Sequence, residues 1–263
     1  MRAISSVCGA ADGSVADRLD VRKEGAVYKF FKYVLLGPGL KVVYRPWAKG
    51  LKNIPAEGGA IMASNHLSFS DSLFLPLVMK RKVVFLGKSE YFTGKGVRGA
   101  LVRAFMSGVG TIPVHRGRGK ATEAAVRTGL QVLANGELLG IYPEGTRSPD
   151  GKLYRGRTGV ARMAIESGCP VIPVAMIDTH IAQPIGKKVP SRHQTGVKVG
   201  PPLDFSHLAG KQDDREVLRE VTDQIMQAIQ RESGQEYVDR DAGAVKREMD
   251  RASSGHWEGE LGD

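Results

Sequence analysis

Residues 60–71 read Ala60-Ile61-Met62-Ala63-Ser64-Asn65-His66-Leu67-Ser68-Phe69-Ser70-Asp71, an apolar run that leads into a polar turn. The run is typical of a buried strand. His66 and Asp71 are five positions apart, whereas neighbours on a helix face are three or four apart. We therefore expect a turn that folds the Asp71 carboxylate back towards the His66 imidazole, which would make a general base at neutral pH.

Asp71 and His66 each allow a second interpretation. Asp71 also suits the cap of a helix that begins at Ser72, and a histidine in isolation is commonly structural. Ser68 and Ser70 lie between the pair, but neither stands in the Gly-x-Ser-x-Gly elbow of a serine nucleophile. No His or Cys pair at ligand spacing accompanies them. We expect neither a covalent nucleophile nor a metal ion.

A second apolar run, Leu138–Ile141, leads into a second polar turn, Tyr142-Pro143-Glu144-Gly145-Thr146-Arg147-Ser148. From residue 60 onward such runs alternate with helical patterns. Strands are expected at 60–64, 83–87, 110–114, 138–142, 171–175 and 196–199, and helices at 72–80, 97–106, 120–134, 157–167 and 214–231. This alternation predicts an α/β fold in one domain, residues 51–231, with a mixed, largely parallel sheet flanked by helices. Both turns should then lie at the carboxyl edge of the sheet.

The net charge of +10 calls for an anionic partner, such as nucleic acid, a membrane surface or a phosphorylated substrate. From Lys80 to Lys120, ten basic residues stand against Glu90 alone, whereas the chain after Arg231 has nine acids and four bases. The positive field should therefore belong to the N-terminal half, with His66. No recognised nucleic-acid-binding module accompanies it, so we expect no nucleic-acid partner.

Residues 25–50 are predicted to form an amphipathic helical segment that associates with a membrane. From Ala26 to Pro55 the chain has six basic residues and no acid, interleaved with aromatic residues. Such a segment can lie at headgroup depth with its lysines facing anionic lipid. Two helices packed on the domain are the alternative. Residues 1–24 are expected to be poorly ordered, and residues 232–263 to form a polar tail.

Cys8 and Cys169 give no disulfide framework, which fits a reducing cytosolic compartment. The first residues contain several aspartates and lack an apolar core, so we expect no secretion signal. No run approaches about 18 consecutive apolar residues, so we also expect no membrane-spanning helix.

Four blocks of the sequence resemble, in order and spacing, those of the glycerolipid acyltransferase family, whose type members are the 1-acyl-sn-glycerol-3-phosphate acyltransferases. The blocks are Asn65-His66-x4-Asp71, Gly110–Arg116, Tyr142–Ser148 and Val171–Val174. The resemblance covers roughly residues 50–205. The second block departs from the family pattern, which often has Phe-Ile-x-Arg where this chain has Ile112-Pro113-Val114-His115-Arg116.

The resemblance implies that His66 deprotonates a glycerol hydroxyl, which attacks the thioester of acyl-CoA or acyl-carrier protein. Asp71 would orient the imidazole and Asn65 would support it. The residues implied to bind the phosphate and glycerol of the acceptor are Arg116, Glu144, Gly145, Thr146 and Arg147. Lys88, which follows another predicted strand, is a further candidate for the phosphate. No cofactor is implied besides the acyl co-substrate.

The implied reaction moves a fatty acyl group to the sn-2 hydroxyl of 1-acylglycerol-3-phosphate and gives phosphatidic acid in phospholipid biosynthesis. Its acceptor resides in the bilayer and its donor is cytosolic, so we expect a peripheral protein at the cytosolic face of a membrane. One alternative is the same chemistry on glycerol-3-phosphate or another lysophospholipid. Another is a non-catalytic lipid-binding protein of the membrane surface. The choice of donor, the acyl length and the oligomeric state are left open.

Overall fold

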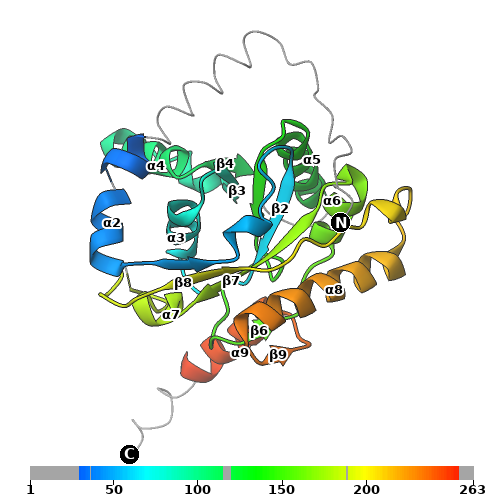
Figure 1. Cartoon of the computed structure of the whole chain (residues 1–263). Helices are drawn as coiled ribbons and strands as arrows, with labels where there is room; N and C mark the ends of the chain where they lie inside the picture. The colour runs from blue at the N-terminus through cyan, green and yellow to red at the C-terminus, as the bar shows by residue number, and fades with distance from the viewer. Residues whose placement is uncertain (1–29, 36, 115–119, 188, 255–263) are drawn as a thin grey trace, which may run out of the picture.

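A computed structural model describes residues 30–35, 37–114, 120–187 and 189–254. Within that part, a seven-stranded sheet lies between two layers of helices (Figure 1). Its strands are β1 (Trp47–Lys49), β2 (Ala60–Ser64), β3 (Val83–Lys88), β4 (Thr111–Val114), β5 (Leu138–Ile141), β7 (Val171–Ile177) and β8 (Gly196–Val199). The predicted α/β fold is confirmed, and all six predicted strands are present.

The strand order is β1-β8-β7-β2-β5-β3-β4. The five strands from β7 to β4 are parallel, β8 is antiparallel to β7, and β1 is parallel to β8. The sheet is therefore mixed and mostly parallel, as predicted. It begins at Trp47, before the predicted domain start at residue 51, because the short β1 pairs with β8.

The larger helices are α2 (Gly37–Tyr44), α3 (Asp71–Val78), α4 (Gly96–Gly108), α5 (Lys120–Ala134), α6 (Gly159–Ser167), α8 (Arg215–Ser233) and α9 (Ala242–Ser254). Shorter elements are η1 (Phe31–Leu35), η2 (Leu51–Asn53), η3 (Ser89–Tyr91), α7 (Thr179–Ala182), η4 (Ser206–Leu208) and the paired strands β6 (Leu153–Tyr154) and β9 (Tyr237–Val238). Figure 1 shows α2, α3 and α4 on one side of the main sheet and α5, α6 and α8 on the other. None of the helices in the described ranges combines the length and apolar character needed to cross a bilayer.

Strand β2 shows why its sequence is an unbroken apolar run. Met62 packs with Phe74 and Leu75 of α3 on one face, while Ile61 and Ala63 belong to the core on the other face. All five of its residues are buried. A central parallel strand that is covered on both sides has no solvent face and therefore no alternation of polar residues.

The predicted N-terminal membrane segment, residues 25–50, is described from residue 30 onward. It contains η1, α2 and β1. The ring of Tyr44 meets the ring of Phe74 edge-on at 5.3 Å, so α2 packs on α3. Lys32 is buried and its Nζ donates to the carbonyl of Met79. Association of this segment with a membrane stays a prediction, and residues 1–24 lie outside the described ranges.

The predicted polar tail, residues 232–263, differs from the structure, which forms β9 and α9 there. Ala242 and Val245 are buried against Tyr154 of β6. Three ion pairs join residues 152–157, around β6, to residues 236–241, around β9. They are Lys152–Glu236 at 2.8 Å, Arg155–Asp239 at 3.4 Å and Arg157–Asp241 at 3.3 Å. These partners are far apart in sequence, so the polar composition alone did not indicate a packed segment.

Candidate active site

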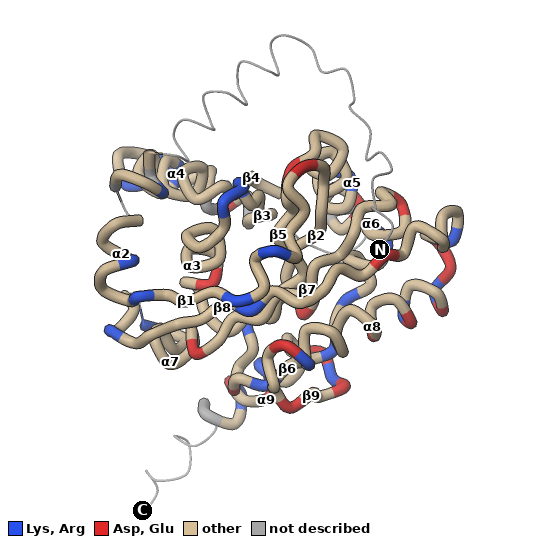
Figure 2. Tube along the Cα trace, in the orientation of Figure 1, with Lys and Arg blue, Asp and Glu red and all other residues tan. Residues whose placement is uncertain are grey.

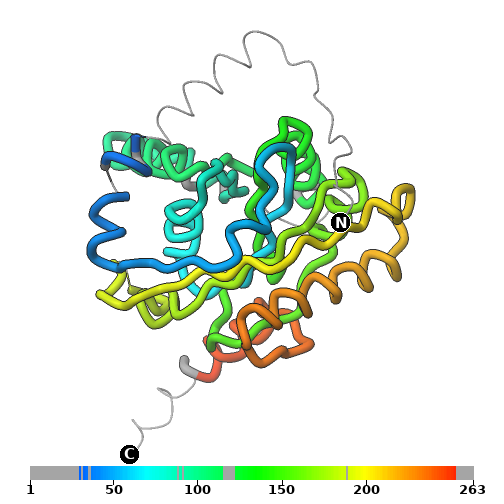
Figure 3. Tube along the Cα trace, viewed as in Figure 1, coloured from blue at the N-terminus to red at the C-terminus, as the bar shows by residue number. Residues whose placement is uncertain are grey.

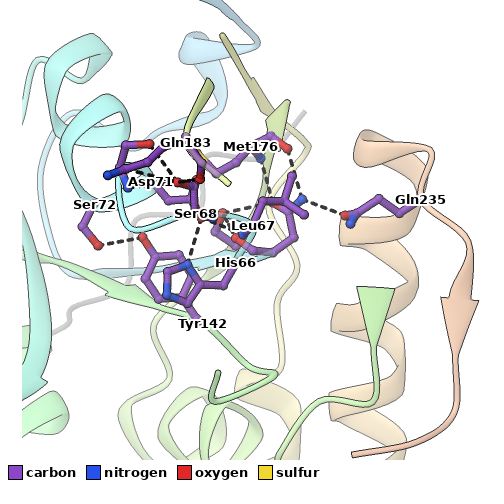
Figure 4. Close-up of polar contacts among 12 residues, drawn as sticks. His66, Leu67, Ser68, Asp71, Ser72, Tyr142, Met176, Gln183 and Gln235 are labelled. Atoms are coloured by element: carbon purple, nitrogen blue, oxygen red, sulfur yellow. Dashed lines mark hydrogen bonds and ion pairs between the residues drawn. The ribbon is translucent and has the colours of Figure 1, made fainter. Parts of the chain in front are cut away.

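The turn after β2 brings His66 and Asp71 together (Figure 4). Nδ1 of His66 lies 2.9 Å from Oδ2 of Asp71, and the His66 side chain is 18% exposed. Because a carboxylate can only accept, this contact places the proton on Nδ1 and leaves Nε2 as the proton acceptor. The geometry is that of an oriented general base at the carboxyl end of a strand.

Asp71 is the first residue of α3 and is fully buried. Its Oδ2 also accepts from the backbone N–H groups of Leu67 at 2.7 Å and Ser68 at 2.8 Å. The carboxylate thus bonds the preceding turn and His66, rather than capping the helix amides that follow it. In the described part of the chain Oδ1 has no hydrogen-bond partner. The turn that the sequence predicted holds this carboxylate firmly in place.

Tyr142 fixes the other side of the imidazole, and the sequence did not indicate this role. Its ring stacks on the His66 ring with centroids 3.9 Å apart and planes 10° apart. Its hydroxyl lies 3.0 Å from Oγ of Ser72 in α3. Tyr142 follows the end of β5, so two neighbouring parallel strands position His66 and the ring that stacks on it.

Asn65 is buried and holds the start of the His66 turn. Its side chain accepts from the N–H of Met176 at 2.7 Å and donates to the carbonyl of Met176 at 3.1 Å. It also donates to Oε1 of Gln235 at 2.7 Å, while Gln235 Nε2 donates to the carbonyl of Gly151 at 2.6 Å. Gln235, whose contact with the His66 turn is drawn in Figure 4, therefore joins that turn to the loop after β5. It lies in the predicted tail, far from Asn65 in the sequence, so no local pattern indicated this contact.

The second turn, residues 142–148, lies against the first. The N–H of Ser148 donates to the carbonyl of His66 at 2.8 Å. Gly145 has φ +73°, a left-handed conformation that glycine adopts without strain, and it is exposed. Thr146 and Arg147 are half-buried. The structure thus brings His66, Asp71 and the predicted Gly145–Arg147 segment to one edge of the sheet.

Glu144 is buried with only 1% of its surface exposed. Its Oε1 accepts from the N–H of Tyr154 at 3.2 Å, and Oε2 has no partner among the described residues. Burial raises the pKa of Glu144 to about 8, and the Tyr154 N–H offsets only part of that shift. In this geometry Glu144 has no free face for the acceptor, so its predicted contact with substrate has no support from the structure.

Replacing Glu144 with Gln should change how stability depends on pH. The folded pKa lies above the ordinary value of 4.5, so the folded state holds this proton more tightly than the unfolded chain. The stability that protonated Glu144 contributes is therefore fully present at low pH and is lost as pH rises through about 8. We expect the melting temperature of the native protein to fall, relative to that of Glu144→Gln, between about pH 5 and about pH 9. If the melting temperatures of the two proteins change with pH in the same way across this range, the raised pKa of Glu144 is contradicted.

Two arginines lie close to the exposed Gly145. Arg147 has no hydrogen bond or ion pair within the described ranges, which leaves its guanidinium available for an anion. Arg157 was not singled out from the sequence. A Cβ built on Gly145 would lie 2.9 Å from Nε of Arg157, whose backbone N–H donates to the carbonyl of Pro143 at 2.8 Å. Guanidinium groups bind phosphate oxygens in a forked geometry, so Arg147 suits a phosphorylated ligand. Arg157 already forms an ion pair with Asp241 at 3.3 Å.

Two predicted cations are not fully placed. Lys88 ends β3 and its backbone pairs in register with Val114 of β4, but its side chain is outside what the structure describes. Arg116 lies outside the described residues altogether. Among the described residues, no group of three or more His, Cys, Asp or Glu could hold a metal ion.

Several known proteins and one family model are similar to this chain. A family model described as "Acyltransferase" matches residues 46–177. The 1-acyl-sn-glycerol-3-phosphate acyltransferase of Bacillus subtilis is 28% identical over 213 residues, which cover 77% of this chain and 95% of that protein. The chloroplastic 1-acyl-sn-glycerol-3-phosphate acyltransferase BAT2 of Brassica napus is 27% identical over 146 residues, but only 41% of its length is covered.

A solved structure has a similar fold. It is the crystal structure of the 1-acyl-sn-glycerophosphate acyltransferase PlsC from Thermotoga maritima, with 25% sequence identity and a TM-score of 0.58. The similarity covers 82% of each chain. The matched family segment, residues 46–177, contains both polar turns and most of the sheet, whereas Gln235 and the C-terminal β9 and α9 lie beyond it.

Proposed function

The chain belongs to the acyltransferase family, and from that premise we propose that it acylates the sn-2 hydroxyl of 1-acylglycerol-3-phosphate to give phosphatidic acid. The donor is acyl-CoA or acyl-carrier protein, and no cofactor takes part. The observation that carries the proposal is the 2.9 Å contact of His66 with a buried carboxylate. The similarity to proteins named for this reaction supports the choice of acceptor.

In the proposed reaction, Nε2 of His66 takes the proton of the acceptor hydroxyl as its oxygen attacks the thioester carbonyl. The new C–O bond forms, the C–S bond breaks, and the departing thiolate receives the proton from the imidazolium. Oδ2 of Asp71 accepts from two backbone N–H groups and from Nδ1–H, which holds the imidazole in the orientation that the transfer needs. Between the two proton transfers His66 carries a positive charge. The Asp71 carboxylate and the face of the Tyr142 ring stabilise this charge.

The phosphate of the acceptor binds beside the Gly145 turn. Arg147 belongs to that turn, and Lys88 and Arg116 are further cations proposed for the same anion. Glu144 does not contact the substrate in this proposal. Its Oε1 accepts from the N–H of Tyr154 and so holds the turn against β6. The protein works at the cytosolic face of a membrane as a peripheral protein, with residues 25–50 on the lipid surface.

Arg147→Ala should act on acceptor binding. Removing a guanidinium that grips a phosphate costs a charge-assisted contact, so we expect KM for the phosphorylated acceptor to rise roughly 10- to 100-fold, with a smaller change in kcat. KM for the acyl donor should change little. Arg127→Ala, on the exposed face of α5, is the matched control. An unchanged KM for the acceptor would remove Arg147 from the proposed phosphate site.

The experiment that tests the function uses the purified full chain, a labelled acyl-CoA and a panel of acceptors, with products resolved by position of acylation. We expect phosphatidic acid acylated at sn-2 from 1-acylglycerol-3-phosphate. A product only from glycerol-3-phosphate or from another lysophospholipid would move the acceptor assignment. Binding of lipid without any transfer would favour a non-catalytic lipid-binding protein and would end the proposal.

A further inference from the structure

The side chain of Asn65 continues the pairing of β2 with β7. The last registered pair of the two strands is Ser64 with Val174. Beyond it, Oδ1 of Asn65 accepts from the N–H of Met176 at 2.7 Å, and Nδ2 donates to the carbonyl of Met176 at 3.1 Å. The amide group thus takes the place of a backbone peptide, which leaves the backbone free to turn out of the sheet at His66. Asn65 is fully buried, so its second N–H also needs an acceptor.

Gln235 supplies this acceptor from the end of α8. Its Oε1 accepts from Nδ2 of Asn65 at 2.7 Å, and its Nε2 donates to the carbonyl of Gly151 at 2.6 Å. Its backbone is fixed as well, because its N–H donates to Oγ of Ser233 at 3.2 Å and its carbonyl accepts from Nε2 of Gln230 at 3.2 Å. The Gln235 side chain therefore joins two segments from an anchored position.

These contacts belong to a closed ring of hydrogen bonds that runs through Asn65 and His66. From Gln235 the ring passes to the carbonyl of Gly151, whose N–H donates to Oγ of Ser148 at 3.0 Å. The N–H of Ser148 donates in turn to the carbonyl of His66 at 2.8 Å. The backbone that carries the imidazole is thus held through the side chain before it and through its own carbonyl, and Gln235 closes the ring.

The segment that carries Gln235 is also anchored independently of this ring. Figure 3 shows the orange chain that follows α8 beside the green chain around β6, and β9 pairs in parallel with β6. Ala242 and Val245 are buried against Tyr154. Figure 2 shows basic and acidic residues intermixed around β6, β9 and α9, where exposed ion pairs add little stability each. Loss of the Gln235 side chain should therefore leave the segment in place.

We propose that Gln235 is a positioning residue for the acyl transfer, because it closes the ring that holds the backbone of His66 and so fixes where Nε2 points. This inference rests on the proposed function, in which His66 is the base. A base that is free to shift spends less time in the reacting geometry, which lowers kcat. Gln235 lies beyond residues 46–177, which the family model matches, so the C-terminal segment completes the active site of this chain.

The test uses the full chain with Gln235→Met, a side chain of similar length that can make neither bond. We expect kcat to fall roughly tenfold, as a group that positions the base is loosened, with KM for both substrates within about twofold of native. The matched control is Glu236→Ala, which removes the ion pair with Lys152, whose partners are 66% and 40% exposed. It should keep the native kcat, because that ion pair joins the same two segments without belonging to the ring.

Two further variants separate positioning from a loss of fold. Gln235→Glu still accepts from Asn65, but its carboxylate has no hydrogen to donate to Gly151, so kcat should fall here too. In the His66→Ala background, Gln235→Met should have almost no further effect on the residual rate, because it acts through the imidazole. A loss of folded protein would instead lower the rate by the same factor in both backgrounds.

Nitrogen NMR of the histidine side chains gives a readout that does not depend on turnover. The His66 signal, identified by its absence from His66→Ala, should shift or broaden in Gln235→Met and stay native in Glu236→Ala. A native kcat and a native His66 signal in Gln235→Met would overturn the positioning role, as would equal losses of rate with and without His66. If the native protein acylates no acceptor while Gln235→Met alone changes the His66 signal, the positioning role stands and the proposed function fails.

Discussion

His66→Ala is expected to lower kcat roughly 10²- to 10⁴-fold, the usual contribution of a positioned general base. The methyl group of alanine cannot accept the hydroxyl proton. The substitution also removes the ring that stacks on Tyr142 and the hydrogen-bond donor to Oδ2 of Asp71. KM for the acceptor should change much less, because other residues are proposed to bind the phosphate. Initial rates at saturating acceptor and donor measure the effect.

The control for this variant is His207→Ala, since His207 is exposed in η4 and distant in sequence from both turns. It should retain native turnover. A His66→Ala protein that melts like the native protein yet keeps kcat within about twofold would exclude the imidazole as the base.

Asp71→Asn is expected to lower kcat by a similar factor, roughly 10²- to 10⁴-fold. An amide oxygen can still accept from the N–H groups of Leu67 and Ser68, so the turn can be kept. The neutral amide no longer stabilises the positive charge that forms on His66. The transition state therefore loses stabilisation. Steady-state kcat and KM at several pH values measure it.

The double variant His66→Ala with Asp71→Asn sharpens this prediction. If Asp71 acts through His66, the second substitution should add almost nothing to the loss caused by the first, because residues that act as a unit are not additive. Fully multiplicative losses would instead give Asp71 a role separate from the base, such as holding the turn.

The sequence predicted much of the sheet because buried parallel strands leave a local signal. The runs at 60–64, 138–142 and 171–175 correspond to β2, β5 and β7, the strands covered on both faces. It did not predict β1, whose three residues are too few to show a pattern. It also missed β9 and α9, because they are held by ion pairs and small buried residues and not by an apolar run.

The contact of His66 with Asp71 was predictable because both residues belong to one short turn. Tyr142 and Gln235 were not, since their contacts with His66 and Asn65 join segments far apart in sequence. Glu144 shows a different limit. A carboxylate in a polar turn suggests a ligand-binding group, and only the packing of β6 over it reveals that the side chain is buried.

A reaction without acceptor tests direct transfer most sharply. If the alcohol attacks the thioester itself, the purified protein mixed with an acyl-CoA labelled in its acyl group should release no stoichiometric burst of thiol and should carry no label after denaturation. Adding 1-acylglycerol-3-phosphate should then start thiol release and phosphatidic acid formation together. One equivalent of thiol released before the acceptor is added, with the label retained on the native chain and absent from His66→Ala, would contradict direct transfer.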